Sequence, residues 1–138
     1  MNDNPSRDPW KQQPSGSAAA TAAMHGNSTA FVYKHEDRIA VVEFSFRNQF
    51  GDWVNDAGYC FRPDGTLAQI RSRLDSFHSD MIVVRDYLFS DECRQIALER
   101  SDYALHTKTP KKPDPDFWDF PLPLYQRVGD LPFARVHR

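Results

Sequence analysis

The sequence has few cysteines and glycines, two and six in 138 residues, and it lacks long apolar runs. No stretch approaches the roughly 20 apolar residues that a transmembrane helix needs, so we expect no membrane span. The formal net charge is -2, so the chain has no excess of positive charge to attract nucleic acid or an anionic membrane. The composition therefore predicts no nucleic-acid partner, and it leaves the cellular location open.

The two cysteines are predicted to be free thiols. Cys60 lies in a predicted strand and Cys93 in a predicted turn two strands away. Two strands span about 10 Å, which is beyond the reach of a disulfide. We expect Cys60 to be buried and inert, and Cys93 to be the more accessible thiol.

Patterns that hold metals or cofactors are also missing. The five histidines show no HxH or HxxxH spacing, and no Cys-x-x-Cys pair occurs. No glycine-rich phosphate loop or nucleophile elbow is present. The sequence therefore assigns no metal, no cofactor and no catalytic residue.

The N-terminal segment, 1–30, differs in composition from the rest of the chain. It is rich in Pro, Ser, Asn, Gln and Ala and has few large apolar side chains, which predicts a disordered or flexible tail. The Ala-x-Ala spacing in SAAATAAM is typical of signal-peptidase sites, but no basic end and apolar stretch precede it. We therefore expect no signal peptide.

The most informative feature is an internal repeat. Three segments, FVYKHEDRIAVV, YCFRPDGTLAQI and YLFSDECRQIAL, begin at Phe31, Tyr59 and Tyr87 and are therefore equally spaced along the chain. Each has aromatic residues at its first and third positions, an acid at its sixth and an aliphatic residue at its twelfth. One structural unit therefore occurs three times.

The middle copy shows what the unit is. Pro63 presets its own φ, the Asp64 side chain can accept hydrogen bonds from nearby backbone N–H groups, and Gly65 tolerates a positive φ. This pattern, with strand-like residues on both sides, is typical of a β-hairpin. The motif occurs in many unrelated β proteins, so it identifies no family.

The repeat predicts a mainly β fold, a single antiparallel meander of about six strands formed by three hairpins of period 28. The expected strands are residues 31–34, 38–47, 53–62, 66–77, 81–89 and 94–105. Their length favours a curled sheet over a flat one. A helix is the competing interpretation for 66–77 and 91–103, which are rich in Leu, Arg, Gln and Glu.

The last part of the chain is predicted to cover the sheet. From Pro110 onward, six prolines alternate with large apolar residues, which excludes a regular helix or a central strand. We expect an extended strap whose apolar side chains lie against the sheet: Phe117, Trp118, Phe120, Leu122, Leu124, Tyr125, Leu131 and Phe133. The predicted organisation is a tail over 1–30, a sheet domain over 31–105 and a strap over 106–138.

A non-catalytic binding or protein-interaction module is the leading functional hypothesis. The three hairpin turns should project from one end of the sheet and form an interaction edge of acidic residues: Glu36, Asp37, Asp64, Asp91 and Glu92. A partner could bind there or on an exposed sheet face. The edge strand at 94–105 could pair with a second copy, which predicts a homodimer.

Two alternatives come from other classes. The curled sheet could carry a small apolar ligand in a cavity lined by six aromatic side chains: Phe44, Phe46, Tyr59, Phe61, Tyr87 and Phe89. An enzyme of unknown class could instead gather His78, Asp80 and His106 at a cleft. The first needs an unfilled core, and the second needs the three side chains within a few ångströms of one another.

Overall fold

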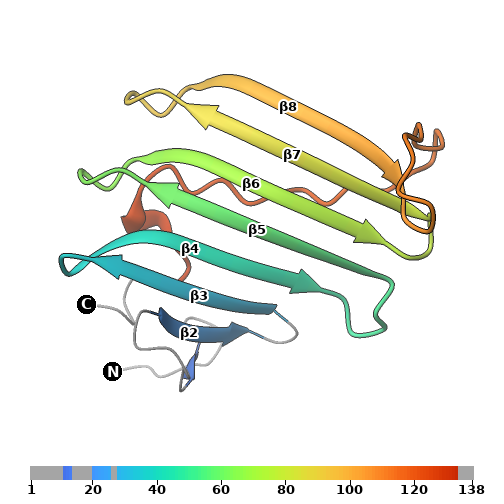
Figure 1. The fold of residues 1–138 in the computed structure, drawn as a ribbon. Helices are drawn as coiled ribbons and strands as arrows, with labels where there is room; N and C mark the ends of the chain where they lie inside the picture. The colour runs from blue at the N-terminus through green and yellow to red at the C-terminus, as the bar shows by residue number, and fades with distance from the viewer. Residues whose placement is uncertain (1–10, 14–19, 26–27, 134–138) are drawn as a thin grey trace.

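The computed structural model describes residues 11–13, 20–25 and 28–133. They form one antiparallel sheet in which strands adjacent in the sequence are adjacent in space (Figure 1). The strands are β1 (Lys11–Gln13), β2 (Ala20–His25), β3 (Ser28–His35), β4 (Arg38–Arg47), β5 (Trp53–Phe61), β6 (Leu67–Ser76), β7 (Met81–Phe89) and β8 (Gln95–Ala104). The helical residues in these ranges form one 3-10 turn, η1 (Val128–Asp130). The predicted antiparallel meander is confirmed.

The six predicted strands correspond to β3 to β8. Both segments for which a helix competed, 66–77 and 91–103, contain strands, β6 and β8. The short strands β1 and β2 extend the sheet beyond β3 and were not predicted, since they lie in the segment interpreted as a tail. The rest of that segment up to residue 27 lies outside the described residues.

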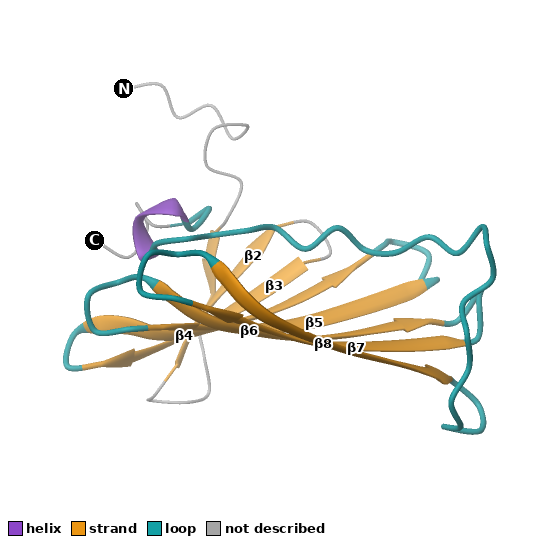
Figure 2. Cartoon of the chain, turned by 90° about the horizontal axis from the view of Figure 1, so that it is seen from above, coloured by secondary structure: helices purple, strands orange, loops and turns teal. Residues whose placement is uncertain are grey.

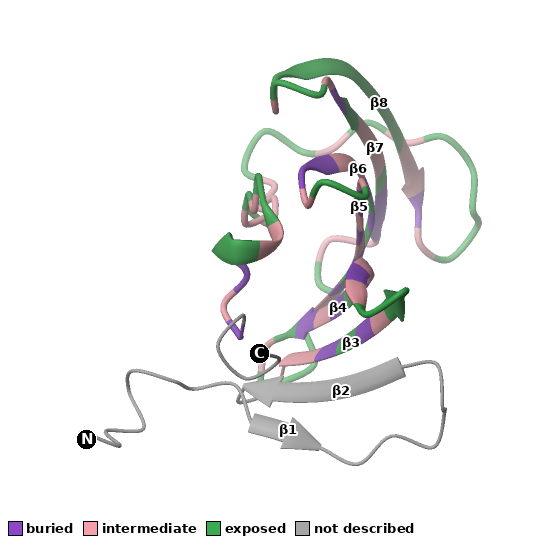
Figure 3. Cartoon of the chain, turned by 90° about the vertical axis from the view of Figure 1, so that its left-hand side faces the viewer, coloured by how far each residue is buried: buried purple, intermediate pink, exposed green. Residues whose placement is uncertain are grey.

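Alternation of side chains gives the sheet two different faces. On β4, Val42, Phe44 and Phe46 are buried on one face, while Glu43 and Arg47 are exposed on the other. The sheet from β3 to β8 curls, and the C-terminal segment lies on its concave side (Figure 3). We call this the strap face and the opposite side the open face.

The strap runs in extended form lengthwise along the strands (Figure 2). Leu131 and Phe133 at its end are buried, and Phe120, Leu122 and Tyr125 pack partly buried against the core. Burial of each such side chain contributes about 1.5–3 kcal/mol. Leu124, one of the eight residues predicted to lie against the sheet, is exposed instead, because an extended segment turns part of its side chains outward. Trp118 is 51% exposed, and its ring lies 5.2 Å from that of Trp53 in β5.

Hydrogen bonds fix the strap to the second hairpin. The Leu67 amide donates to the carbonyl of Gln126 at 2.9 Å, and the Val128 amide donates to the carbonyl of Gly65 at 2.9 Å. The buried Tyr59 hydroxyl donates to the carbonyl of Pro123 at 2.5 Å. These bonds satisfy backbone groups of a segment that has few amides of its own to pair.

The internal repeat is visible in the strand register. Each hairpin has one unpaired residue just after its turn, at Ala40, Ala68 and Ile96, and these positions keep the spacing of the sequence repeat. The residues at the twelfth position of the three segments, Val42, Ile70 and Leu98, lie in one row across the strap face. Tyr59 and Tyr87 lie between them in this row, because the five residues are successive cross-strand partners.

The first hairpin departs from the repeat by one residue. Val32, not Phe31, is paired with Val42 and so occupies the row of Tyr59 and Tyr87. Phe31 consequently lies on the open face and is exposed. The cause is the turn, which has only two residues between His35 and Arg38, both with positive φ, as in the hairpins with the tightest loops.

The second and third turns are equivalent. In the second, the Gly65 amide donates to the carbonyl of Arg62 at 2.8 Å, and in the third the Cys93 amide donates to the carbonyl of Ser90 at 2.9 Å. Gly65 has φ +86° and Cys93 has φ +64°. The third turn thus places a side-chain-bearing residue where the second has glycine, at a cost in backbone strain.

We expect Cys93→Gly to raise the free energy of unfolding by about 0.5–1 kcal/mol, because glycine adopts a positive φ without the clash that a Cβ causes. Urea denaturation of the variant and the parent chain measures the change. Cys93→Ala is the matched control, since alanine removes the thiol but keeps the Cβ and should leave the stability nearly unchanged. An equal gain in both variants would assign the effect to the thiol and contradict the backbone explanation.

Candidate functional site

The acidic turn residues lie together at one end of the sheet. The turns β3–β4, β5–β6 and β7–β8 project from the same end of the sheet (Figure 1), and all five acidic residues are exposed: Glu36, Asp37, Asp64, Asp91 and Glu92. The Asp64 carboxylate accepts hydrogen bonds from the Thr66 hydroxyl at 2.6 Å and amide at 2.9 Å, which lower its pKa. Within the described ranges, no group of three potential ligand side chains could hold a metal ion.

The six aromatic candidates lie on the strap face. Five are buried and Tyr87 is half-buried. The Phe44 ring lies 5.1 Å from that of Phe46 and 5.3 Å from that of Tyr59, and both Phe44 and Tyr59 also contact the ring of Tyr125. Burial raises the pKa of the Tyr59 hydroxyl. The rings pack on one another and on the strap, while Phe61 and Phe89 belong to the same core.

The strap leaves part of its face uncovered. Between the strap and the β7–β8 pair lies a groove of about 690 Å³. Its apolar lining includes Tyr87 and Phe89 from β7, Leu98 from β8, and Leu122 and Pro123 from the strap. Of the six aromatic candidates, only Tyr87 and Phe89 reach this groove. The sequence did not predict it, because composition does not tell how far a strap extends across a sheet.

An ionic cluster closes one part of the groove. Arg85 of β7 has a side chain that is only 10% exposed, and it forms an ion pair with Asp119 of the strap. Arg100 of β8 contacts the same Asp119 oxygen at 3.3 Å and Asp102 at 2.9 Å. The other oxygen, Asp119 Oδ1, is buried and accepts no hydrogen bond from any described residue. Two guanidinium groups thus balance the charge of Asp119 but leave one acceptor unsatisfied.

β8 is the edge strand beside the groove. It pairs with β7 on one side, and no other strand of the described residues pairs with it on the other side. Residues 95–101 are exposed, including two large apolar side chains, Ile96 at 66% and Leu98 at 46%. A long edge strand with apolar side chains is a surface on which another strand can pair.

The loop after β8 covers only one end of that edge. The Lys111 amide donates to the carbonyl of Asp102 at 3.2 Å, and the Ala104 amide donates to the carbonyl of Thr109 at 2.8 Å. The returning loop therefore occupies the edge near the end of β8. The free edge, as we use the term below, is residues 95–101.

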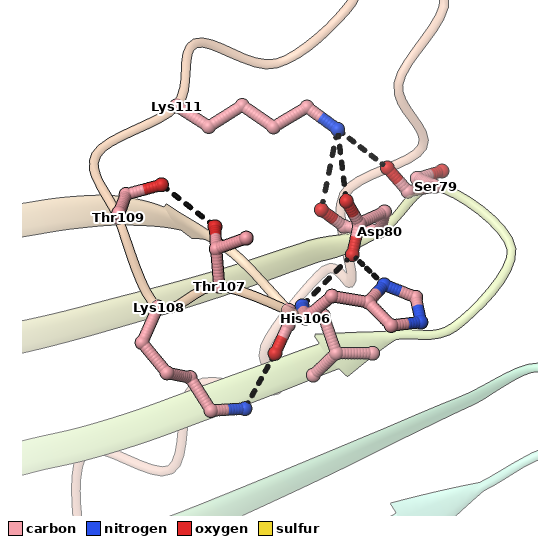
Figure 4. A network of polar contacts seen from close by, with 8 residues as sticks. Ser79, Asp80, His106, Thr107, Lys108, Thr109 and Lys111 are labelled. Carbon is pink, nitrogen blue, oxygen red and sulfur yellow. Dashed lines mark hydrogen bonds and ion pairs between the residues drawn. The ribbon is translucent and has the colours of Figure 1, made fainter.

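Two of the three residues of the enzyme hypothesis come together. Asp80 Oδ1 lies 2.5 Å from Nδ1 of His106 and accepts a hydrogen bond from the His106 amide at 3.0 Å, while Lys111 Nζ lies 3.7 Å from Asp80 Oδ2 (Figure 4). The bond from the His106 ring is the main cause that lowers the pKa of Asp80. The third residue, His78, is exposed and makes no hydrogen bond or ion pair with the rest of the described chain.

The Asp80–His106 pair orients an imidazole, as an acid–base dyad does. It lies on an exposed loop, and it lines neither the groove nor the hollow of the open face. The same contacts hold the loop after β8 against the β6–β7 turn. The geometry thus accounts for a structural clamp, and the pair alone provides no nucleophile or substrate pocket.

The open face has a shallow hollow of about 790 Å³ around Gly58 of β5. Two arginine side chains that line it form ion pairs, with Arg71 3.5 Å from Asp86 and Arg73 2.7 Å from Asp75. Cys60 lies in this hollow half-buried rather than buried as predicted, because its strand position faces outward. Burial still raises the pKa of its thiol, and both cysteines are free, as expected.

Comparison of the chain with protein-family models, with curated proteins and with solved structures gives no match. The helical residues of the described ranges form no segment long and apolar enough to cross a membrane. A functional proposal therefore has to be argued from the geometry of the free edge, the groove and the ionic cluster.

Proposed function

We propose that the protein is a non-catalytic binding module that accepts an extended peptide segment as an added strand along β8. The observation that carries the proposal is the free edge, residues 95–101, which is exposed and borders an apolar groove. Added strands gain affinity from main-chain hydrogen bonds and specificity from pockets for alternate side chains. The free edge supplies the main-chain groups, and the groove supplies a pocket for side chains.

The direction of the backbone groups supports this surface. Asp102 and Ala104 bond to the returning loop, so their main-chain groups point away from β7. Because this direction alternates along a strand, the groups of Leu98 and Arg100 point the same way, toward the free edge. A partner strand as long as the free edge would find these groups available for pairing.

The other surfaces supply less for a partner. The Asp64 carboxylate in the second hairpin turn accepts two hydrogen bonds from Thr66, and Arg71 and Arg73 on the open face are paired with Asp86 and Asp75. The carrier alternative needs a cavity among the aromatic side chains, and these pack on one another. The free edge combines backbone groups that lack a partner strand with the exposed apolar side chains of Ile96 and Leu98.

The test begins with a random dodecapeptide phage library panned against the immobilised chain. Enriched peptides are then synthesised, and their affinity for the parent chain is compared with that for Leu98→Pro and Leu98→Thr by fluorescence anisotropy. We expect Leu98→Pro to weaken binding at least tenfold, because proline removes an N–H from the free edge. Leu98→Thr keeps the N–H and should weaken binding by no more than about threefold.

The thermal midpoint of each variant serves as the control for folding. Peptides that bind Leu98→Pro as tightly as the parent chain would contradict strand addition, and so would a library that yields no binder. A second copy of the chain could also occupy the edge, and sedimentation of the chain alone tests for this dimer. A dimer that Leu98→Pro abolishes would assign β8 to a second copy and would replace the peptide proposal.

A further inference from the structure

Glu99, an exposed acid on the free edge, gives the segment that β8 accepts a chemical requirement. We infer that this segment runs antiparallel to β8 and carries a basic residue, lysine or arginine, opposite Glu99. The inference rests on the proposed strand addition at β8 and adds a side-chain contact to the main-chain hydrogen bonds. The partner that the edge selects is then an extended segment in which a basic residue is followed by an apolar one.

The charges in one row of the open face stop alternating at β8. In this row Arg71 of β6, Asp86 of β7 and Glu99 of β8 are successive cross-strand partners. The two carboxylates at the end of the row are therefore directly opposite each other, and like charges at such positions are unfavourable. A basic residue on the next strand would restore the alternation of charge.

The carboxylate of Glu99 lacks a partner in the described part of the chain, whereas that of Asp86 is satisfied. The side-chain amide of Gln69 donates to Asp86 Oδ1 at 2.8 Å, and the Arg71 guanidinium lies 3.5 Å from Asp86 Oδ2. Both contacts come from β6, on the far side of Asp86 from the edge. Glu99 itself is exposed and forms no hydrogen bond or ion pair with any described residue. It is thus accessible to a side chain that arrives on an added strand.

The direction of the added strand follows from the loop after β8. Pro110 in that loop is an antiparallel bridge partner of Tyr103, and the Lys111 amide donates to the carbonyl of Asp102 at 3.2 Å. The loop therefore already takes the place of an antiparallel neighbour at the end of β8. A segment that continues this line along the free edge is antiparallel as well.

In this orientation Glu99 and the residue opposite it form a close pair. The main-chain groups of Leu98 and Arg100 point toward the free edge, so these two residues would exchange hydrogen bonds with the added strand. Glu99 between them would belong to a non-hydrogen-bonded pair, in which the Cα atoms are only about 4.5 Å apart. A basic side chain at that position can reach the Glu99 carboxylate.

The residue after the basic one would face the groove. Successive side chains of a strand point to opposite faces, so in an antiparallel strand this residue lies opposite Leu98 on the strap face. Leu98 is 46% exposed and lines the groove together with Leu122 and Leu124 of the strap. An apolar side chain there would be partly buried, and it would hold the register that brings the basic residue to Glu99.

The Glu99 side chain also makes the edge selective. A charged residue on an edge strand discourages pairing with unrelated strands. An acid opposite Glu99 would add a third carboxylate to the row, whereas a basic residue would offset the charge of Glu99. Discrimination between partners thus comes from attraction and repulsion at the same position.

The test uses acetylated and amidated heptapeptides of sequence Thr-Val-Zaa-Val-Thr-Val-Thr, in which Zaa is Lys, Gln or Glu. A heptapeptide matches the length of the free edge, and in an antiparallel strand its third residue lies opposite Glu99. Titration of the ¹⁵N-labelled chain at low ionic strength follows the backbone amide signals of Leu98 and Arg100. We expect the Lys peptide to bind about threefold to fivefold more tightly than the Gln peptide, and the Glu peptide to bind more weakly than both.

Exchange of the charge at position 99 is the decisive comparison. In Glu99→Lys the order should reverse, so that the Glu peptide binds most tightly, and in Glu99→Gln the three affinities should agree within about twofold. Both variants should fold, because Glu99 is exposed and its replacement relieves the repulsion from Asp86. Glu36→Gln is the matched control, since it removes one negative charge from the exposed β3–β4 turn and should keep the preference for Lys.

Three outcomes would count against these proposals in different ways. If the Gln peptide binds the parent chain as tightly as the Lys peptide and both shift the β8 signals, the inference fails and strand addition stands. If no peptide shifts those signals, strand addition of this kind fails as well. A preference for Lys that survives in Glu99→Gln would overturn the assignment of the contact to Glu99.

Discussion

Phe133→Ala should lower the free energy of unfolding by about 3–5 kcal/mol, the range for removing a buried phenylalanine side chain. Phe133 is fully buried at the end of the strap, with its ring 5.9 Å from that of Phe44. The neighbouring rings are held by the sheet and cannot fill the space. Chemical denaturation of the variant and the parent chain measures the difference.

Phe50→Ala is the matched control for this prediction. Phe50 lies in the β4–β5 turn and is 78% exposed, so its replacement should change the stability by less than about 0.5 kcal/mol. Similar losses in both variants would mean that the end of the strap does not belong to the core.

Arg85→Met should lower the free energy of unfolding by about 3 kcal/mol, because it leaves Asp119 with an uncompensated charge next to the core. Arg100 offsets only part of that charge, since it is also paired with Asp102. The second replacement, Asp119→Leu, should recover most of the loss, because a buried ion pair can usually be replaced by apolar residues of similar volume. A double-mutant cycle of the four chains measures the coupling.

The control for the ion pair is Arg71→Met on the open face. Arg71 is 74% exposed and lies 3.5 Å from Asp86, so its replacement should change the stability by less than about 1 kcal/mol. If the effects of Arg85→Met and Asp119→Leu were simply additive, the two side chains would not act as a pair and the buried cluster would be misinterpreted.

The hairpins were predictable because their signals are local. The Pro63-Asp64-Gly65 turn and the constant spacing of the repeat indicate strands on both sides, and they favoured strands for the segments that form β6 and β8 without excluding helices. The face of Phe31 was not predictable from the repeat. It depends on a turn one residue shorter than in the other copies, which the aligned sequence letters do not reveal.

The groove and its ionic cluster depend on contacts between distant parts of the chain. Arg85 of β7 and Asp119 of the strap are far apart in the sequence, and nothing in the residues around either one indicates the other. The proline content predicted an extended strap, but its path over the sheet is set by contacts such as that of Tyr59 with Pro123. Asp80 and His106 were named together from the sequence, and their contact depends on the loop after β8.

The order of the strands also bears on how the chain folds. Every described strand pairs only with its neighbours in the sequence, so each pairing closes a short loop and costs little chain entropy. The strap is the exception, since its Pro123 meets Tyr59 from a distant part of the chain. We therefore expect the hairpins to form first, with the concave face still wet, and the strap to dock in a later step that expels water from the core.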